Sequence, residues 1–212
     1  MVQVKICGIT RIADAEKAVE LGANALGFIF AESARRISPE KAREITQRIS
    51  PFIKTVGVFV NETSSTIREI IQFCGLDLIQ LHGDETVSDC AELGSGIIKA
   101  FRVKGEETLA QITPYKEHVR AILLDTYQKG LDGGTGKTFD WHLACQAKKI
   151  GIPMVLSGGL HTDNVQEAVQ AVNPSAIDIS SGIEKAPGVK DHEQMRLFME
   201  KVADFQRMEQ HR

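Results

Sequence analysis

The sequence predicts an α/β fold, a single-domain (β/α)8 TIM barrel with a parallel, closed sheet of eight strands, and three observations support it. First, eight short apolar runs recur along the 212 residues, and most are continuously apolar, like strands covered on both faces. Second, amphipathic segments with helix-start residues separate these runs, and such alternation is typical of parallel sheets. Third, eight units in this length leave about 26 residues each, close to the minimum for a β/α unit. No linker or change in composition divides 1–212, so one barrel domain is the economical interpretation.

The predicted strands are short and rich in β-branched residues and leucine, as strands are. In chain order they are Val2–Ile6, Ala25–Phe30, Thr55–Val60, Leu76–Leu81, Ile97–Phe101, Ala121–Leu124, Pro153–Leu156 and Ala176–Ile179. The segments between them begin with residues that cap helices. The predicted starts are Thr10, Ser38 with Pro39 at the first helical position, Thr63, Asp84, Thr162 and Asp191.

The main alternative is an open, doubly wound sheet, which would be expected to carry a glycine-rich nucleotide fingerprint after an early strand. Gly94-Ser95-Gly96 starts such a pattern, but Lys99 stands where the third glycine is required. Gly136-Lys137-Thr138 resembles the end of a phosphate-binding P-loop, but Leu131 stands where its first glycine is required. Neither motif is complete, so the sequence favours the closed barrel.

Composition and charge exclude several classes of protein. The net charge of −3 argues against a nucleic-acid or anionic-membrane partner, because such partners favour a clustered basic excess. No apolar run has the length of a membrane span, and the amino terminus has no signal-peptide pattern. Cys7, Cys74, Cys90 and Cys145 are widely spaced, which suits a reducing cytoplasm and neither a disulfide framework nor a zinc site. We therefore expect a cytoplasmic protein in which the last three cysteines are inert packing residues.

Two chemically useful side chains stand at the carboxyl ends of predicted strands, where barrels of this kind keep their active sites. Cys7 follows the first strand, and Asp125 follows the sixth, which lies nearly across the mouth once the barrel closes. A thiol and a carboxylate that face each other across a small pocket form a candidate acid–base pair. The alternative is that Cys7 packs in the core and Asp125 caps the next segment.

Two glycine-containing turns follow the last two predicted strands. Ser157-Gly158-Gly159 follows the seventh strand, and Ser180-Ser181-Gly182 follows the eighth. Glycine lets backbone N–H groups approach an anion, and these two loops are the customary phosphate site of this barrel. Either sequence alone would indicate an ordinary turn, but side by side they predict phosphate binding.

Three further segments border the predicted mouth. Arg35 and Arg36 follow the second strand and offer a guanidinium group to a substrate carboxylate. The longest loop, Thr126–Thr138, contains several glycines and is a candidate lid over a ligand. His82 stands after the fourth strand and is a candidate substrate contact. The plainer interpretations are solvated arginines, a simple connection and a histidine without a chemical role.

Short motifs recur at nearly every predicted strand end, in order from residue 5 to residue 182. They are Lys5-Ile6-Cys7-Gly8-Ile9-Thr10, Gly27-Phe28-Ile29-Phe30, Val56-Gly57-Val58-Phe59-Val60, Gln80-Leu81-His82-Gly83, Leu123-Leu124-Asp125-Thr126, Gly133-Gly134-Thr135-Gly136-Lys137-Thr138-Phe139-Asp140-Trp141, Leu156-Ser157-Gly158-Gly159-Leu160 and Asp178-Ile179-Ser180-Ser181-Gly182. Any one of them is weak evidence. Together they make the chain resemble phosphoribosylanthranilate isomerase, an enzyme family of tryptophan biosynthesis.

The resemblance implies a (β/α)8 barrel that needs neither a metal nor an organic cofactor. The implied reaction is an Amadori rearrangement that converts N-(5-phosphoribosyl)anthranilate to an open-chain amino-deoxyribulose phosphate, so the implied partner is a small phosphorylated sugar–anthranilate substrate. The family's general base, a cysteine after the first strand, falls on Cys7, and its general acid, an aspartate after the sixth, falls on Asp125. The arginine that holds the anthranilate carboxylate falls on Arg35. Arg36 is the second choice, because the loop carries two consecutive arginines.

The residues expected to bind this substrate surround the same mouth. They are Arg35, Gln80, His82, Gly134, Gly158, Gly159, Ser181 and Gly182. The sequence leaves both a monomer and a homodimer open.

Two other functions are also considered. One is another phosphate-binding sugar isomerase or epimerase. The related histidine-pathway isomerase uses an aspartate where Cys7 stands, so the thiol counts against it. The other is a barrel that binds a phosphorylated ligand without catalysis. Such a protein would keep the glycine turns without needing Cys7 opposite Asp125.

Strand parity adds a prediction that does not depend on the resemblance. Side chains alternate along a strand, so Lys5 points the same way as Cys7 and lies one layer deeper in the barrel. An unpaired ammonium group there would be costly. Asp178 lies on the eighth strand, next to the first once the barrel closes, so we expect a Lys5–Asp178 ion pair beneath the thiol. The alternative is that Lys5 reaches solvent and Asp178 caps a loop.

Overall fold

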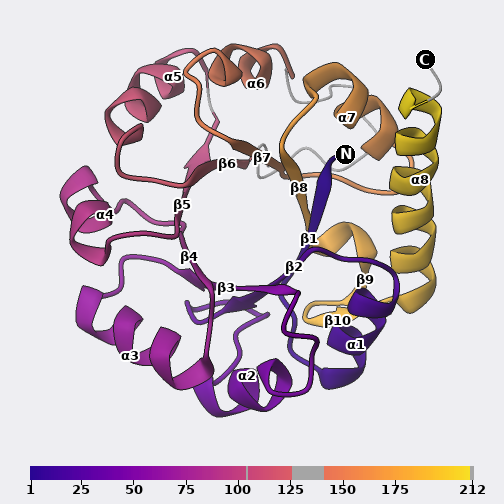
Figure 1. The fold of residues 1–212 in the computed structure, drawn as a ribbon, viewed down its shortest axis with the longest axis horizontal. Helices are drawn as coiled ribbons and strands as arrows, with labels where there is room; N and C mark the ends of the chain where they lie inside the picture. Colours follow the sequence, from indigo (N-terminus) through magenta and orange to yellow (C-terminus); the bar gives the residue numbers. More distant parts are fainter. Residues whose placement is uncertain (104, 126–140, 211–212) are drawn as a thin grey trace.

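The computed structural model describes residues 1–103, 105–125 and 141–210, and its main feature is a closed parallel barrel. The strands follow one another around the barrel in chain order from β1 to β8, and β8 pairs with β1 to close it (Figure 1). Helices surround the barrel on the outside, so the outer face of the sheet is covered. The predicted fold class is confirmed.

The barrel strands are short, and each corresponds to one predicted apolar run. They are β1 Gln3–Cys7, β2 Ala25–Ile29, β3 Lys54–Phe59, β4 Leu78–Leu81, β5 Ile97–Arg102, β6 Ala121–Asp125, β7 Met154–Ser157 and β8 Ala176–Ile179. Several extend one residue further at the carboxyl end than predicted, among them β1 and β6. Cys7 and Asp125 are therefore the last residues of strands, paired in register with Gly27 and Ser157. The positions of the two catalytic candidates are therefore set by strand register and not by the conformation of a loop.

Helices alternate with these strands along the chain. They are α1 Ile12–Glu20, α2 Pro39–Thr46, α3 Ser64–Cys74, α4 Val87–Leu93, α5 Glu107–Ile112, α6 Trp141–Lys148, α7 Val165–Val172 and α8 His192–Gln210, with the 3₁₀ turns η1 Thr113–Tyr115 and η2 Ser181–Ile183. Three predicted starts are confirmed by their caps. Ser38, Thr63 and Asp191 each accept a backbone N–H from the first turn of the following helix.

Two predicted helix starts lie too early in the chain. Asp84 does not cap α4. Thr86 caps it instead, in a reciprocal capping box with Asp89. Thr162 also precedes the true start, because α7 begins at Val165. In both cases the loop between strand and helix continues past the first residue that could cap a helix.

The hairpin formed by β9 Glu184–Ala186 and β10 Val189–Lys190 was not predicted. It explains why the predicted capping role of Thr10 is wrong. The Thr10 hydroxyl donates to the carbonyl oxygen of Gly188 in the hairpin turn, and α1 begins without a side-chain cap. A tertiary contact thus takes the group that was expected to stabilise the helix end.

Two apolar clusters fill the fold. The larger packs the outer side of the barrel against the helices. The smaller comes from β3, β5, β6 and β7, and its members are Val56, Ile98, Ala100, Leu123 and Val155. Leu123 and Val155 have the same parity along their strands as Asp125 and Ser157, so this cluster points into the barrel. The barrel interior is therefore apolar at its base and polar toward the mouth.

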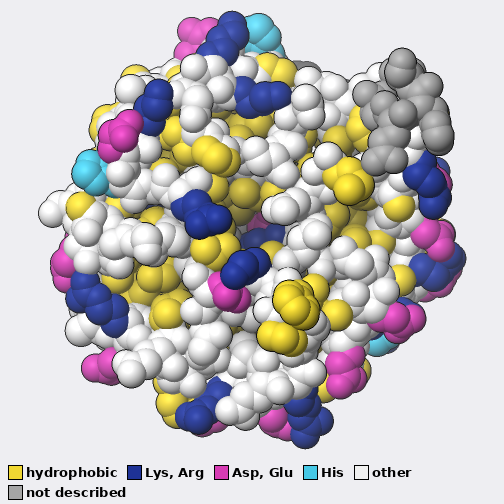
Figure 2. All heavy atoms as spheres, viewed as in Figure 1, with side chains coloured by type: hydrophobic (Ala, Val, Ile, Leu, Met, Phe, Trp, Pro, Cys, Tyr) yellow, Lys and Arg dark blue, Asp and Glu magenta, His cyan; other side chains and the backbone are white. Residues whose placement is uncertain are grey.

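The surface carries charge of both signs. On the face shown in Figure 2, basic and acidic side chains are interspersed around the edge, and further charged side chains lie near the centre among hydrophobic ones. None of the helices in the described part of the chain combines the length and the apolar composition that a membrane span requires.

A buried ion pair joins the first strand to the last. Lys5 of β1 is in register with Asp178 of β8, and Lys5 Nζ donates to Asp178 Oδ1 at 2.9 Å. Lys5 is 4% exposed and Asp178 is 5% exposed. The predicted pair is confirmed, and the alternative in which Lys5 reaches solvent is wrong. The pair lies on the seam where the barrel closes.

Asp178→Asn should lower the free energy of unfolding by about 3 kcal/mol or more, because it leaves the Lys5 ammonium group buried without its counter-charge. Lys5→Met should also destabilise the protein, and the double variant should lose less than the sum of the two single losses, because no charge then remains buried. Urea unfolding followed by circular dichroism measures all three. Lys17→Met is the control, because Lys17 forms a surface pair with Glu20 and its loss should change stability by less than about 0.5 kcal/mol. Additive losses in the double variant would contradict this coupling.

Candidate active site

The thiol of Cys7 lies at the carboxyl end of β1, at the mouth of the barrel, and the residue is 6% exposed. Gly27 of β2 lies directly beside it. A Cβ atom at Gly27 would be 2.7 Å from Cys7 Sγ and 3.1 Å from Lys5 Cε, and the first distance is shorter than real Cβ contacts. Glycine at this position therefore makes room for both the thiol and the lysine beneath it.

A chain of polar contacts crosses the mouth from β1 to β6. Lys5 Nζ donates to Gln80 Oε1 at 2.9 Å, in addition to its bond with Asp178. The amide nitrogen of Gln80 lies 3.1 Å from His82 Nδ1, and His82 Nε2 lies 3.3 Å from Asp125 Oδ2. The end of β4 thus connects the lysine beneath the thiol to the Asp125 carboxylate. The structure brings the two residues predicted as an acid–base pair into one connected site.

The surroundings of Cys7 act on its ionisation in opposite directions. Burial raises the pKa of the Cys7 thiol, Lys5 and Lys190 lower it, and the Asp178 carboxylate raises it, so that the pKa stays above its ordinary value. Burial alone would lower the pKa of Lys5, but the neighbouring Asp178 and Cys7 outweigh it, so the pKa of Lys5 is raised. At neutral pH the resting site therefore holds a protonated thiol beside a charged lysine.

Arg35 is held beside Cys7 by a carboxylate from the β9–β10 hairpin. Its Nε and Nη2 atoms donate to the Glu184 carboxylate at distances of 2.7 to 3.0 Å. Its stem lies over Gly8, where a Cβ atom would be 2.9 Å from Arg35 Cδ. The bidentate contact with Glu184 uses one edge of the guanidinium group and fixes its plane.

Lys190 connects Glu184 to the ends of β1 and β8. The residue is 1% exposed, and its Nζ donates to Glu184 Oε1 at 2.9 Å, to the Cys7 carbonyl oxygen at 2.6 Å and to the Ser180 carbonyl oxygen at 3.2 Å. Burial alone would raise the pKa of Glu184, but hydrogen bonds from Arg35 and Lys190 lower it. Burial lowers the pKa of Lys190, and Glu184 opposes that effect. One buried lysine therefore positions the arginine relative to the thiol.

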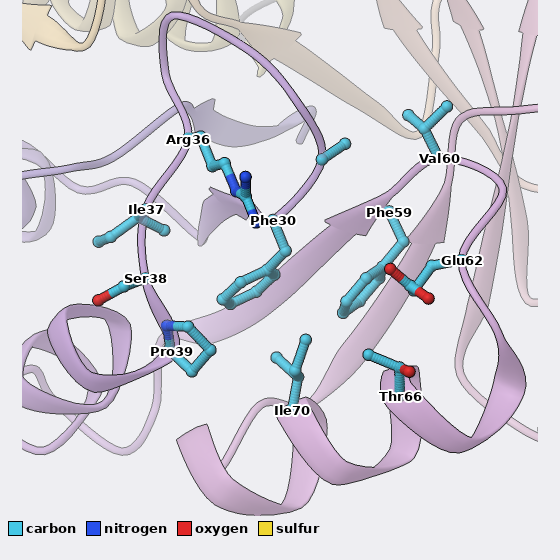
Figure 3. A pocket seen from close by; sticks show the side chains of 11 residues that line it. Phe30, Arg36, Ile37, Ser38, Pro39, Phe59, Val60, Glu62, Thr66 and Ile70 are labelled. Carbon is cyan, nitrogen blue, oxygen red and sulfur yellow. The ribbon is translucent and has the colours of Figure 1, made fainter.

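Arg36 points into a different part of the molecule from Arg35. It lines a cavity of about 390 Å³ between the ends of β2 and β3 and the helices α2 and α3. Figure 3 shows its side chain extending toward Phe30, whose ring stacks on that of Phe59 with the centroids 5.3 Å apart. Among the described residues that line this cavity, Cys7 does not occur. The two neighbouring arginines thus serve different places, and Arg35 is the one beside the thiol.

The two predicted phosphate-binding turns lie against each other. Gly158 and Gly159, after β7, have positive φ angles of 83° and 65°, which glycine adopts without strain. A Cβ atom at Gly182, after β8, would be 2.1 Å from the Leu160 carbonyl oxygen. Glycine at 182 is therefore required for the close approach of the two turns, and Ser181 lies next to it at the surface. That phosphate binds here stays a prediction.

Two of the cysteines other than Cys7, Cys74 and Cys90, have the properties of packing residues. All four cysteines are free, with Cys74 and Cys90 buried and Cys145 half-buried. Burial raises the pKa of Cys90 to about 11 and also raises the pKa of Cys74. These two thiols are therefore poor nucleophiles at neutral pH.

The predicted lid, Thr126–Thr138, and with it Gly134, lies outside the described residues. Its role over a ligand stays a prediction. Gln80 and His82 lie at the mouth as expected, where their side chains contact each other. Their contact with substrate likewise stays a prediction.

Sequence reasoning missed three residues of this site, Gly27, Glu184 and Lys190. Gly27 lies in the middle of a predicted strand, but the reason why it has to be glycine is the thiol of Cys7 on the neighbouring strand. Glu184 and Lys190 flank Pro187-Gly188, which is a turn signal between two short polar segments. That signal was sufficient to suggest a hairpin, although not its position over the mouth.

Comparisons with known proteins show which family this chain resembles in sequence and fold. Residues 4–201 match the family model described as N-(5'phosphoribosyl)anthranilate (PRA) isomerase. An N-(5'-phosphoribosyl)anthranilate isomerase from Geobacter metallireducens is 50% identical over 203 residues, which cover 95% of this chain and 99% of that protein. The crystal structure of phosphoribosyl anthranilate isomerase from Thermotoga maritima has a TM-score of 0.89 and 42% identity, covering 96% of this chain and 100% of that one.

A further solved structure shows a phosphoribosyl anthranilate isomerase in complex with reduced 1-(o-carboxyphenylamino)-1-deoxyribulose 5-phosphate. It has a TM-score of 0.86 and 40% identity, and it covers 96% of this chain and 100% of its own. The similarity thus extends along almost the whole length of both proteins.

The Cys7 thiolate should form at a higher pH than that of an ordinary cysteine, because burial and the charge of Asp178 together raise its pKa more than Lys5 and Lys190 lower it. The difference in ultraviolet thiolate absorbance between the wild type and Cys7→Ser should rise with pH, with a midpoint above the usual thiol value of about 8.5. Lys5→Met should move this midpoint further upward, since the thiolate then loses its positive neighbour. Lys17→Met should leave it unchanged. A wild-type midpoint below the usual value, or a downward shift in Lys5→Met, would show that the balance of effects is wrong.

Proposed function

Because the chain belongs to the N-(5'-phosphoribosyl)anthranilate isomerase family, we propose that Cys7 and Asp125 carry the two proton transfers of that reaction at the mouth of the barrel. The enzyme is an aldose–ketose isomerase of tryptophan biosynthesis, and it converts an aminoaldose phosphate to an aminoketose phosphate by an Amadori rearrangement. The observation that supports the residue assignment is the polar chain from Lys5, beneath the thiol, to the Asp125 carboxylate.

Asp125 acts as the general acid. It donates a proton to the ring oxygen of the phosphoribosyl group, and the ring C–O bond breaks to leave an open-chain protonated imine. The thiolate of Cys7 then removes the proton from the adjacent sugar carbon, and the electron pair of that C–H bond forms an enolamine. The enolamine becomes the ketone when its terminal carbon gains a proton and its hydroxyl group loses one. The cycle leaves Cys7 protonated and Asp125 ionised, so one proton returns before the next turnover.

The raised pKa of Cys7 is compatible with a role as the base. A thiol that ionises above neutral pH offers little thiolate, but the thiolate it does offer is a stronger base. The protonated imine strongly acidifies the neighbouring C–H bond, so a modest population of thiolate is sufficient. Lys5 keeps this population from falling further, because its charge favours the ionised thiol.

Arg35 binds the anthranilate carboxylate in this proposal. Glu184 holds the Nε–Nη2 edge of the guanidinium group, and the Nη1 atom carries two further N–H donors for a second carboxylate. Arg35 also lies beside Cys7, whereas Arg36 lines the cavity against α2 and α3. These positions support Arg35 over Arg36 as the substrate contact.

The substrate phosphate binds at the turns after β7 and β8 in this proposal. Backbone N–H groups of Gly158, Gly159, Ser181 and Gly182 are the expected donors, with Gly134 of the loop after β6 as a further contact. The phosphorylated ligand in the related solved structure supports a phosphorylated substrate here. The monomer or homodimer, the cytoplasmic location and a reaction without metal or organic cofactor stay predictions.

The alternative functions have less support. A different sugar isomerase would not account for the match to one family along residues 4–201. A barrel that only binds a phosphorylated ligand would not need a buried thiol whose lysine is connected to a carboxylate across the mouth.

Cys7→Ser and Asp125→Asn should each lower kcat by at least about 10²-fold, the usual effect of losing a positioned proton-transfer group. The assay supplies freshly made N-(5'-phosphoribosyl)anthranilate and quantifies the aminoketose phosphate by chromatography. Cys145→Ser on α6 and Asp204→Asn on α8 are the matched controls and should keep wild-type kcat. Turnover close to that of the wild type in either site variant would show that its residue is misassigned. An inactive wild type would overturn the proposed function itself.

Arg35→Ala should lower kcat/KM by at least about tenfold, and Arg36→Ala should lower it less, because Arg35 lies over Gly8, next to Cys7, whereas Arg36 lines the cavity against α2 and α3. A substrate analogue with hydrogen in place of the anthranilate carboxylate makes the test specific. The wild type should turn over this analogue less well than the substrate, and Arg35→Ala should no longer distinguish the two. Equal discrimination by Arg35→Ala and the wild type, or its loss in Arg36→Ala alone, would overturn the assignment.

A further inference from the structure

The direction of each hydrogen bond in the chain from Lys5 to His82 follows from the chemistry of the groups. An ammonium group only donates, so the Gln80 amide atom that faces Lys5 Nζ at 2.9 Å must be the oxygen. The other end of the amide is then the nitrogen, which also only donates, and it lies 3.1 Å from His82 Nδ1. Nδ1 must therefore accept. The imidazole is left neutral, with its proton on Nε2.

The protonated nitrogen of His82 faces the proposed general acid. His82 Nε2 lies 3.3 Å from Asp125 Oδ2, and both side chains are 23% exposed. With the positive edge of Nε2–H beside Oδ2, the acidic proton of Asp125 is better placed on Oδ1. The contact from Nε2–H strengthens as Asp125 loses that proton, because bonds to a carboxylate are stronger than bonds to the neutral acid. The tautomer of His82 thus determines how Asp125 presents its proton.

We propose that Lys5, Gln80 and His82 form a positioning relay, in which Lys5 orients the Gln80 amide, Gln80 fixes the Nε2-protonated tautomer of His82, and His82 orients Asp125 for proton donation. This inference rests on the proposed role of Asp125 as the general acid. It gives Gln80 and His82 a task besides the substrate contact expected from the sequence. It also means that the lysine beside the base sets the geometry of the acid.

The backbone around His82 is anchored independently of this relay. The His82 N–H donates to the Phe59 carbonyl oxygen at 2.8 Å. Lys99 Nζ, which is buried, donates to the Gly83 carbonyl oxygen at 2.8 Å and to Glu85 Oε2 at 3.0 Å. Because these contacts hold the main chain, a change at Gln80 acts on the imidazole ring rather than on the loop.

The tautomer is tested by long-range proton–nitrogen NMR spectra of the nitrogen-labelled full-length protein at neutral pH. His82→Gln identifies the signals of this ring, and His118→Gln, at an exposed site, should leave them unchanged. We expect Nε2 to be protonated and Nδ1 not. Gln80→Glu keeps an acceptor for Lys5 but replaces the donor that faces Nδ1 with a carboxylate oxygen, so Nδ1 should become protonated. A wild-type ring that is protonated on Nδ1 would overturn the inference.

Kinetics test whether the tautomer matters for the reaction. Gln80→Glu should lower kcat by at least about tenfold with little change in KM, and circular dichroism should show that it stays folded. His82→Gln, which keeps an N–H donor near the position of Nε2, should retain more kcat than His82→Leu. Wild-type kcat in Gln80→Glu, or equal kcat in the two His82 variants, would overturn the positioning role. Failure of the proposed function is distinguishable, because it appears as an inactive wild type or an active Asp125→Asn and leaves the NMR result unaffected.

Discussion

The buried pair between Lys5 and Asp178 is the interaction on which both the barrel and its site depend. It joins β1 to β8 in register, on the seam where the barrel closes. The same ammonium group also lies beneath Cys7 and donates to Gln80. A buried charge that loses its partner is strongly destabilising, so the lysine must keep its position whether or not substrate is bound. The proposed base therefore lies above the interaction that joins the first and last strands.

The same arrangement recurs around the mouth. In the described part of the chain, three buried lysine–carboxylate pairs surround it, namely Lys5–Asp178, Lys99–Glu85 and Lys190–Glu184. Each holds a different functional group: the first the thiol, the second the loop that carries His82, and the third Arg35. Buried pairs add little net stability compared with apolar side chains of similar size, but their directional bonds fix orientation. The polar interior of this barrel is thus better explained by positioning than by stability.

The proposed acid and base require opposite electrostatic surroundings, and they lie on different strands, β6 and β1. Cys7 needs positive charge nearby, because burial disfavours its thiolate, and it has both Lys5 and Lys190 beside it. Asp125 must hold a proton before it donates, and the relay that we propose places a neutral imidazole beside it. Gln80 lies between Lys5 and His82. Its amide group is oriented by Lys5 and in turn orients the imidazole ring, but it brings no charge close to Asp125. An uncharged amide at this position is what allows one lysine to serve both sides of the site.

The local sequence was sufficient to predict the barrel, because each strand is a short apolar run that can be recognised from its own residues. The alternation of side chains along β1 and β8 was sufficient to predict the Lys5–Asp178 pair. The local sequence also placed Cys7 and Asp125 at one mouth, since the carboxyl ends of parallel strands share an edge. Helix starts were less secure, because Thr10 is free to cap a helix only until the hairpin takes its hydroxyl group. Only the tertiary structure decided that Gln80 bridges Lys5 and His82, that Gly27 makes room for the thiol, and that Glu184 and Lys190 reach Arg35. These contacts join residues far apart in the chain, and their geometry exists only once strand register and barrel closure have fixed every side chain at the mouth.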